Sequence, residues 1–172
     1  MKKGYIQVYT GNGKGKTTAI LGLSLRATGA GLKIYIAQFL KYGEYSEIKA
    51  LSRFKENIEI HQYGTGEWVK DKPSQKEIDQ AIHGLALAKK AMTSEKYDII
   101  ILEEANVAVY YGVFSLEALL DFIAVKPEGV ELVISGRYAA PEVIEKADLV
   151  TEMKEIKHYF HKGISARVGI EK

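Results

Sequence analysis

The sequence contains no cysteine, which excludes disulfides, thiolate zinc sites, iron–sulfur clusters and a cysteine nucleophile. It also lacks an excess of one charge, because 24 lysines and arginines against 22 aspartates and glutamates leave a net charge of +2. That balance argues against a protein that coats nucleic acid or anionic lipid. The longest apolar runs, residues 99–102 and 105–109, are far too short to span a bilayer. We therefore expect neither nucleic acid nor a membrane as a partner.

The first residues do not have the pattern of a secretion signal, so we expect none here. The chain begins Met-Lys-Lys, but the apolar stretch that follows is broken by Thr-Gly-Asn-Gly at residues 10–13. With the absence of cysteine, this predicts a cytoplasmic protein. The length of 172 residues matches a single domain at about 150 residues per domain, and no linker or repeat divides it. We therefore expect residues 1–172 to form one domain.

What the sequence does have is a regular alternation of strand-like and helix-like segments. Strands are expected at residues 4–9, 33–40, 58–61, 97–102, 130–135 and 149–153, and helices at 16–30, 45–54, 74–92, 115–124 and from 141. The third of these helices begins with a capping box, Ser74 followed by Glu77. The run at 97–102 is almost entirely apolar, which is typical of a strand covered on both faces. The alternation predicts an α/β fold with a mostly parallel sheet that binds ligands beyond the carboxyl ends of its strands.

A glycine-rich segment between the first expected strand and the first expected helix has the pattern of a phosphate-binding loop, or P-loop. Its residues are Thr10, Gly11, Asn12, Gly13, Lys14, Gly15, Lys16, Thr17 and Thr18. The glycines allow backbone N–H groups to surround an oxyanion, Lys16 can reach a terminal phosphate, and Thr17 can ligate Mg²⁺. Thr10 replaces the first glycine of the strict motif. A structural glycine-rich turn is the alternative, but Gly-Lys-Thr at the helix start favours a three-layer, RecA-like P-loop domain that binds ATP.

Charged residues at the ends of later strands can complete such a site. Glu103 and Glu104 end an apolar strand, where P-loop enzymes place the carboxylate that holds Mg²⁺. Neighbouring residues of a strand point to opposite faces, so we expect Glu104 to face the phosphates and Glu103 to point away. Arg137 follows the fifth expected strand and can clamp phosphate oxygens. The alternatives are a solvated strand end for the glutamates and a surface salt bridge for Arg137. His158 and His161 lack a third metal ligand, which favours ordinary polar roles.

No nucleophile borne by the protein is visible, because the chain has neither a Gly-x-Ser-x-Gly motif nor a cysteine to pair with histidine. A substrate would then have to supply the nucleophile. Two other functions remain open. One is a P-loop kinase or ATPase that releases ADP, and the other is a non-catalytic module that uses nucleotide to switch its binding.

Over nearly its whole length the sequence resembles the P-loop ATP:corrinoid adenosyltransferases, the cob(I)alamin adenosyltransferase family. The resemblance rests on the loop at 9–18, Arg26, Gln38-Phe39, Gly64-Thr65-Gly66, Leu102-Glu103-Glu104, Gly136-Arg137, Ala147-Asp148, Lys157-His158, Gly163, Ala166, Gly169 and Ile170. It implies that the Co(I) of a corrinoid attacks the ribose C5′ of ATP. The 5′-deoxyadenosyl group would move to cobalt, with release of tripolyphosphate, in adenosylcobalamin biosynthesis or salvage.

The resemblance also implies roles for individual residues. The loop and Arg137 would bind the triphosphate, Thr17 and Glu104 would hold Mg²⁺ or Mn²⁺, and Lys16, Glu104 and Arg137 would serve catalysis. Glu103 stands where the family usually has aspartate. The corrinoid substrate would contact the segment Gly64, Thr65 and Gly66.

The corrinoid side departs from the family in one respect. A pair of aromatic residues that helps to strip the lower ligand from cobalt usually follows Gly-Thr-Gly, whereas this chain has Glu67-Trp68-Val69. Trp68 would then do this alone, the alternative being a tryptophan that packs its own loop. The family further implies a homodimer and a reductase that supplies Co(I), for which a flavoprotein is one candidate.

Overall fold

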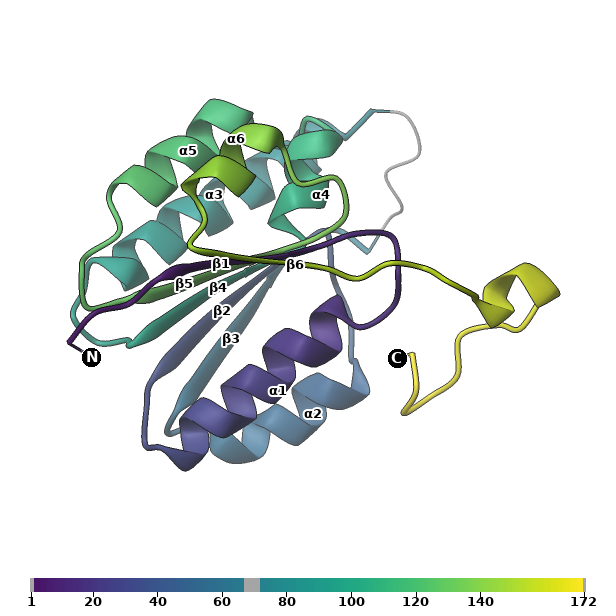
Figure 1. The fold of residues 1–172 in the computed structure, drawn as a ribbon, viewed down its shortest axis with the longest axis horizontal. Helices are drawn as coiled ribbons and strands as arrows, with labels where there is room; N and C mark the ends of the chain where they lie inside the picture. Colours follow the sequence, from purple (N-terminus) through teal and green to yellow (C-terminus); the bar gives the residue numbers. More distant parts are fainter. Residues whose placement is uncertain (1, 67–71, 172) are drawn as a thin grey trace.

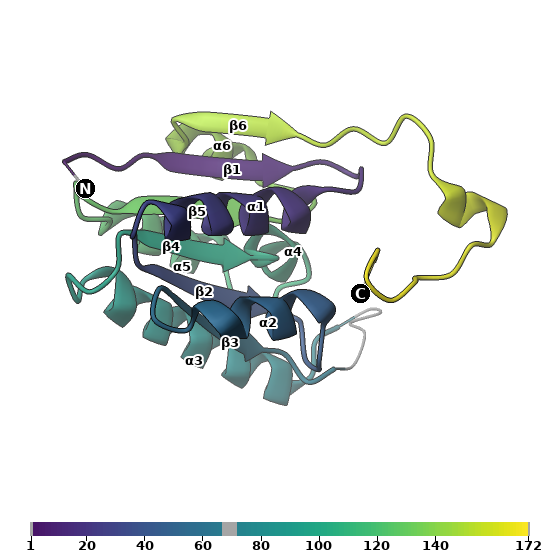
Figure 2. The same ribbon diagram turned by 90° about the horizontal axis from the view of Figure 1, so that it is seen from below.

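The sheet at the centre of the structure has six strands, all parallel, in the order β3-β2-β4-β5-β1-β6. The structure is a computed structural model that describes residues 2–66 and 72–171. The strands are β1 (Ile6–Thr10), β2 (Ile34–Phe39), β3 (Ile58–Tyr63), β4 (Ile99–Glu103), β5 (Glu131–Ser135) and β6 (Leu149–Glu152). Their arrowheads point to one edge of the sheet (Figure 2), so the loops that follow the strands meet there.

Helices cover both faces of this sheet. The helices are α1 (Lys16–Gly29), α2 (Ser46–Leu51), α3 (Gln75–Met92), α4 (Ala105–Tyr110), α5 (Leu116–Ala124) and α6 (Pro141–Lys146), with short 3-10 turns η1 (Ser52–Phe54) and η2 (Tyr159–Lys162). Figure 1 shows α1 and α2 on one face and α3, α4, α5 and α6 on the other. The predicted three-layer α/β fold with a parallel sheet is confirmed.

The apolar strand β4 explains how the two layers of helices are held. Ile99 and Ile101 belong to the core beneath α1 and α2, whereas Ile100 and Leu102 belong to the core beneath α3 and α5. Successive strand residues point to opposite faces, so a strand between two helical layers must be apolar at every position. All five residues of β4 are buried, and burial of each large aliphatic side chain contributes about 1.5–3 kcal/mol.

Every predicted strand and helix is present with ends shifted by at most about two residues, except that the helix expected at 45–54 is α2 followed by η1, and η2 is not predicted. The capping box of α3 is present, with the Ser74 hydroxyl accepting from the amide of Glu77 and the Glu77 carboxylate accepting from the amide of Ser74. The third strand continues to Tyr63, two residues beyond its expected end. Helix α4 is not predicted by the sequence, since it is only six residues long and its N-cap, Glu104, makes no side-chain cap and has a left-handed backbone with φ 60°.

Beyond β6 the chain forms an arm, residues 153–171, that contains η2. Figure 2 shows the arm (yellow) running past the carboxyl edge of the sheet and bending back. Within the described part of the chain, no helix has both the length and the apolar character needed to cross a membrane.

Candidate functional site

The glycine-rich loop joins β1 to α1, where the sequence places it, and its shape depends on the end of β6. The amide of Gly13 donates to the carbonyl oxygen of Met153 at 2.6 Å. A Cβ at Gly13 would lie 2.7 Å from that same oxygen, so no larger residue fits without moving the backbone. Gly15 has φ 126° as the N-cap of α1, a conformation that L-residues with a side chain rarely adopt. Glycine is therefore required at both positions.

Lys16 is folded back over the loop. Its ammonium group donates to the carbonyl oxygens of Gly11 at 2.7 Å and Gly13 at 2.8 Å, and the residue is only 7% exposed. Burial lowers the pKa of this ammonium group, and Glu104 opposes the shift. The two carbonyl oxygens thus hold the ammonium group over the loop, and a bound anion can replace them as its hydrogen-bond acceptors.

Glu103 contacts the loop directly, and the expectation that it points away is wrong. The Thr17 hydroxyl donates to Oε1 of Glu103 at 2.6 Å, and the Lys41 ammonium lies 2.6 Å from the same oxygen. Glu103 is fully buried. Burial lowers the pKa of Lys41, but Glu103, together with Glu104 and Glu47, raises it, and the net shift is upward.

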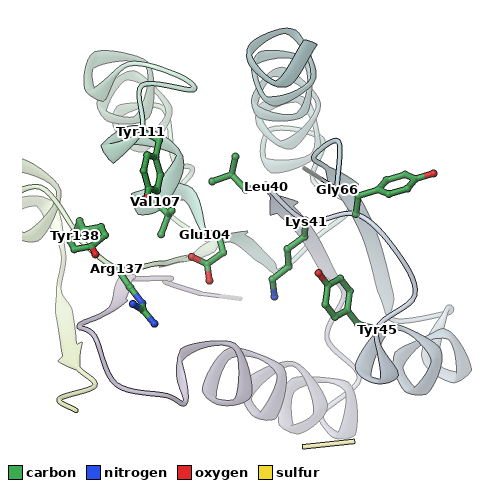
Figure 3. Close-up of a pocket in the computed structure, with 10 residues that line it drawn as sticks. Leu40, Lys41, Tyr45, Gly66, Glu104, Val107, Tyr111, Arg137 and Tyr138 are labelled. Atoms are coloured by element: carbon green, nitrogen blue, oxygen red, sulfur yellow. The ribbon is translucent and has the colours of Figure 1, made fainter. Parts of the chain in front are cut away.

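Glu104, the first residue after β4, also faces this site. Its left-handed backbone ends β4, so the alternation of strand side chains does not extend to this residue. Figure 3 shows the Glu104 carboxylate between Lys41 and Arg137. Burial raises the pKa of the Glu104 carboxyl, and the neighbouring Glu103 charge adds to the shift. The two carboxylates therefore lie close together, Glu103 bonded to Thr17 of the loop and Glu104 lining two cavities.

The oxygen atoms gathered here fit a hard divalent cation. The Thr17 hydroxyl, Glu103 and Glu104 are the ligand types that Mg²⁺ and Mn²⁺ prefer. Among residues 2–66 and 72–171 no group of three or more His, Cys, Asp or Glu residues could hold a metal ion by itself. Mg²⁺ commonly completes its shell with substrate phosphates and water, so one or two carboxylates suffice.

The two histidines considered as metal ligands make local polar contacts instead. The ring of His158 accepts from the amide of Phe160 at 3.0 Å, and His161 lies 2.7 Å from Glu155. Each histidine side chain is therefore accounted for by a local contact in or beside η2.

Two cavities meet at the carboxyl edge of the sheet. The larger, about 830 Å³, is lined by residues 13–18 of the loop, by α2 and by the end of the arm. The smaller, about 370 Å³, has the aromatic walls Tyr42, Tyr45, Tyr111 and Tyr138. Both are lined by Lys41, Tyr45, Glu104 and Arg137. Figure 3 shows these four side chains at the smaller cavity.

Most of the predicted site residues come together around these cavities. Residues 13–18, Glu104 and Arg137 line the larger cavity. Thr10 instead uses its hydroxyl to accept from the amide of Ala139 at 3.3 Å, and Asn12 is exposed at the tip of the loop.

The segment expected on the corrinoid side borders the smaller cavity. Gly66 lines it, Thr65 donates to Glu77, and Gly64 packs so closely on the backbone of Leu40 and Lys41 that a Cβ would lie 2.6 Å from the Lys41 nitrogen. Trp68 lies outside the described residues.

Sequence reasoning missed Lys41 and gave no role to Gln38. Both follow from strand order: β2 pairs with β4, and Gln38 lies opposite Glu103 in the register. The signal available in the sequence was a polar residue, Gln38, near the end of the apolar strand at 33–40, together with the acidic end of the strand at 97–102.

A parallel α/β sheet with a glycine-rich loop before α1 and carboxylates at the end of β4 defines a P-loop nucleotide-binding protein. The family model for ATP:corrinoid adenosyltransferase BtuR/CobO/CobP matches residues 2–171, and the chain belongs to this family.

Relatives agree with this membership. A Pseudomonas aeruginosa protein named corrinoid adenosyltransferase is 34% identical over 171 residues, which cover 99% of this chain and 84% of the relative. The corrinoid adenosyltransferase CobA of Salmonella typhimurium is 30% identical over 177 residues, 99% of this chain and 86% of the relative. An Escherichia coli K12 protein named corrinoid adenosyltransferase is also 30% identical, over 170 residues that cover 99% of this chain and 86% of that protein.

Proposed function

We propose that this chain transfers the 5′-deoxyadenosyl group of ATP to the Co(I) centre of a corrinoid and releases tripolyphosphate. Family membership supports this reaction. The structural observation that carries it is that two cavities of different character share a border of Lys41, Tyr45, Glu104 and Arg137. One contains the phosphate loop, and the other offers aromatic walls to a second substrate. A simple ATPase needs only the first.

The protein's part in this reaction is to hold two substrates in line and to stabilise the leaving group. The Co(I) electron pair forms the Co–C bond as the bond from C5′ to the triphosphate oxygen breaks. Negative charge then develops on the triphosphate, close to Lys16, the loop amides and Arg137, which line the same cavity. Fixed positive groups aimed at that charge lower the barrier because they need no reorganisation.

A divalent metal ion belongs to the same proposal. Thr17 and Glu104 would hold Mg²⁺ or Mn²⁺, and Glu103 lies within hydrogen-bonding distance of the Thr17 hydroxyl. When bound, the ion would neutralise phosphate charge. The buried ion pair of Glu103 with Lys41 holds that carboxylate in place.

The smaller cavity is the proposed corrinoid side. Gly66 lines it, directly after Gly64 and Thr65 in the chain, and its tyrosines can exclude water from the reacting cobalt. Trp68 would contribute beneath the ring. We further propose a single cytoplasmic domain acting as a homodimer, with Co(I) supplied by a reductase such as a flavoprotein.

The decisive experiment incubates the protein with ATP, Mg²⁺ and chemically reduced corrinoid while visible absorbance is followed. We expect a light-sensitive product, since its Co–C bond is weak, and one tripolyphosphate per corrinoid consumed. Accumulation of ADP with an unchanged corrinoid spectrum would replace this reaction by that of a kinase or ATPase. Binding of ATP without any chemical change would indicate the non-catalytic module.

A further inference from the structure

A continuous line of hydrogen bonds crosses three strands from the phosphate loop to the wall of the smaller cavity. Glu103 of β4 accepts from Thr17 at 2.6 Å and also accepts from the side-chain amide of Gln38 of β2. Gln62 of β3 donates to Oε1 of Gln38 at 3.2 Å. Gln62 in turn accepts from the backbone amide of Gly43 at 3.0 Å. The register places Gln38 opposite both Glu103 and Gln62, so the line is built into the sheet.

The direction of these bonds is fixed by the charge at one end. A carboxylate only accepts, so Gln38 must turn its amide nitrogen to Glu103 and its oxygen to Gln62. Gln62 must then donate to Gln38 and is left with an oxygen for Gly43. Glu103 and Gln38 are both fully buried, so reversing the Gln38 amide would leave buried polar groups unpaired at a cost of about 1–3 kcal/mol.

At Gln62 the line of hydrogen bonds reaches Gly43, in the loop at residues 40–45 that joins β2 to α2. This loop supplies Leu40, Lys41, Tyr42 and Tyr45 to the smaller cavity. Its backbone is unusual, because Leu40 has φ 58° and Gly43 has φ 121°. A left-handed leucine is costly and persists only where surrounding contacts over-determine it. The bond from Gly43 to Gln62 is one such contact.

A ligand in the phosphate loop would change the contacts at the Glu103 end of this line. The Thr17 hydroxyl and the Lys41 ammonium share one oxygen of Glu103, each at 2.6 Å. A ligand that draws the Thr17 hydroxyl away leaves Lys41 as the remaining partner of that oxygen. Lys41 belongs to the 40–45 loop, so Glu103 is connected to the loop by two routes, one direct and one through Gln38 and Gln62.

We infer that Gln38 and Gln62 are positioning residues that couple occupation of the phosphate site to the placement of the 40–45 loop, so that ATP and corrinoid each tighten binding of the other. This inference rests on the proposed function. Gln62 lines neither cavity, so its effect would pass through the loop. Coupling between two ligands is reciprocal, and its usual size is 5- to 150-fold in affinity, so we expect about tenfold here.

The test measures binding without turnover. Cobalamin in the Co(II) state is titrated with and without saturating Mg²⁺ and ATP, and ATP is titrated with and without Co(II) cobalamin. No reductant is added, because the transfer needs Co(I). We expect each ligand to lower the dissociation constant of the other about tenfold in the wild-type protein.

Two variants break the line at Gln62. Gln62→Met keeps the side-chain volume but removes both hydrogen bonds, and Gln62→Glu keeps an acceptor for Gly43 while losing the donor to Gln38. Both should bring the ratio of dissociation constants close to one, with each single-ligand constant within about threefold of wild type. The matched control is Gln75→Met, which loses an exposed bond to Asp79 and should keep the wild-type ratio.

The outcomes separate the two proposals. Retention of the wild-type ratio by both Gln62 variants would overturn the inference, as would a wild-type ratio of one with both ligands bound. Failure of the wild-type protein to bind cobalamin at all would overturn the proposed function together with the inference. Gln62 variants that lose single-ligand affinity in proportion, with an unchanged ratio, would indicate a structural role only.

Discussion

The ammonium group of Lys14, inside the phosphate loop, lies 2.7 Å from the carboxylate of Glu171, although 157 residues separate the two in sequence. The same ammonium donates to the hydroxyl of Tyr159 and the carbonyl of Ile170. Arg167 also pairs with Glu171, and its hydrogen bonds, followed by that of Lys14, hold the pKa of Glu171 well below its ordinary value. Charged contacts thus attach the end of the arm to the glycine-rich loop, beside the larger cavity.

We expect high salt to weaken the ion pairs of Glu171 with Lys14 and Arg167. Exposed ion pairs are screened when the Debye length falls from about 10 Å at 0.1 M to about 3 Å at 1 M. Trypsin should therefore cleave after Lys162 and Arg167 several times faster at high salt. Glu171→Gln should cleave fast at every salt concentration, whereas Glu145→Gln on α6 should behave as wild type. A cleavage rate independent of salt in the wild-type protein would contradict this account.

Lys16→Ala should abolish most of the activity while the protein stays folded. Removing one charged donor from a transition-state site typically costs a factor of about 10²–10³ in turnover. The variant loses the two Lys16 bonds to the loop carbonyls but keeps the backbone bond from Gly13 to Met153, so we expect the protein to fold. The check is single-turnover product formation beside a thermal melt, with the exposed Lys55→Ala as control. Wild-type turnover and ATP affinity in Lys16→Ala would exclude the loop as the triphosphate site.

Glu103→Gln and Glu104→Gln should separate stability from turnover. Glu103→Gln leaves the mostly buried Lys41 ammonium without its counter-charge and should cost about 2–3 kcal/mol of unfolding free energy, at the low end for a buried pair because Lys41 keeps some exposure. Glu104→Gln removes a desolvated charge, so the stability should hold or rise while turnover falls. Urea denaturation and initial rates measure the two effects. A stable Glu103→Gln protein would show that the pair with Lys41 contributes little.

The sequence is sufficient to predict the layers of this fold but not the arrangement within its site. Strands such as β4 are predictable because burial on both faces demands an unbroken apolar run. Alternation also predicts opposite directions for Glu103 and Glu104, and it fails because Glu104 leaves the strand with φ 60°. That backbone conformation is set by the start of α4 and has no signature in the sequence, since the residue is not a glycine.

The partners across the sheet are harder still to predict. Gln38 contacts both Gln62 and Glu103 only because β2 lies between β3 and β4. Strand order depends on how the connections cross the sheet, and the local pattern of residues does not encode it. Residues whose contacts depend on strand order, such as Gln38 and Gln62, are therefore the ones to which the sequence alone assigns no role.

Two glycine substitutions should change stability in opposite directions. Gly13→Ala places a Cβ 2.7 Å from the Met153 carbonyl oxygen and 2.8 Å from the Lys154 carbonyl carbon, and backbone cannot yield as a side chain does. We expect a loss of about 1–3 kcal/mol. Gly22→Ala adds a methyl group to an open face of α1 and should gain about 0.5–1 kcal/mol. Urea midpoints decide, and equal midpoints for both variants would refute the close packing of the loop on Met153.

Glu59, on the edge strand β3, should make the unfolding free energy depend on pH. Hydrogen bonds from Tyr97 and then His61 lower the pKa of Glu59 from an ordinary 4.5 to about 2. A lowered carboxyl pKa stabilises the fold above pH 4.5, and this contribution is lost as the pH falls toward 2. Glu59 is 41% exposed, so the amount is at most about 1 kcal/mol.

Unfolding free energies of wild type and Glu59→Gln should therefore differ above pH 5 and converge by pH 2. Glu56→Gln removes a carboxylate from an exposed neighbouring turn and serves as the control. A difference between wild type and Glu59→Gln that does not change with pH would rule out this origin.

The position of β1 in the sheet has a consequence for protein synthesis. In the described sheet β1 pairs with β5 and β6, and the amide of Gly13 is bound by Met153, which follows β6. A ribosome adding about 5–20 residues per second needs on the order of 10 s between making the loop and making these partners. During that interval β2, β3 and β4 can pair with one another, while β1 has no strand to join. The nucleotide site, though encoded first, is thus assembled last, and a nascent chain can bind ATP only when nearly all of it has left the ribosome.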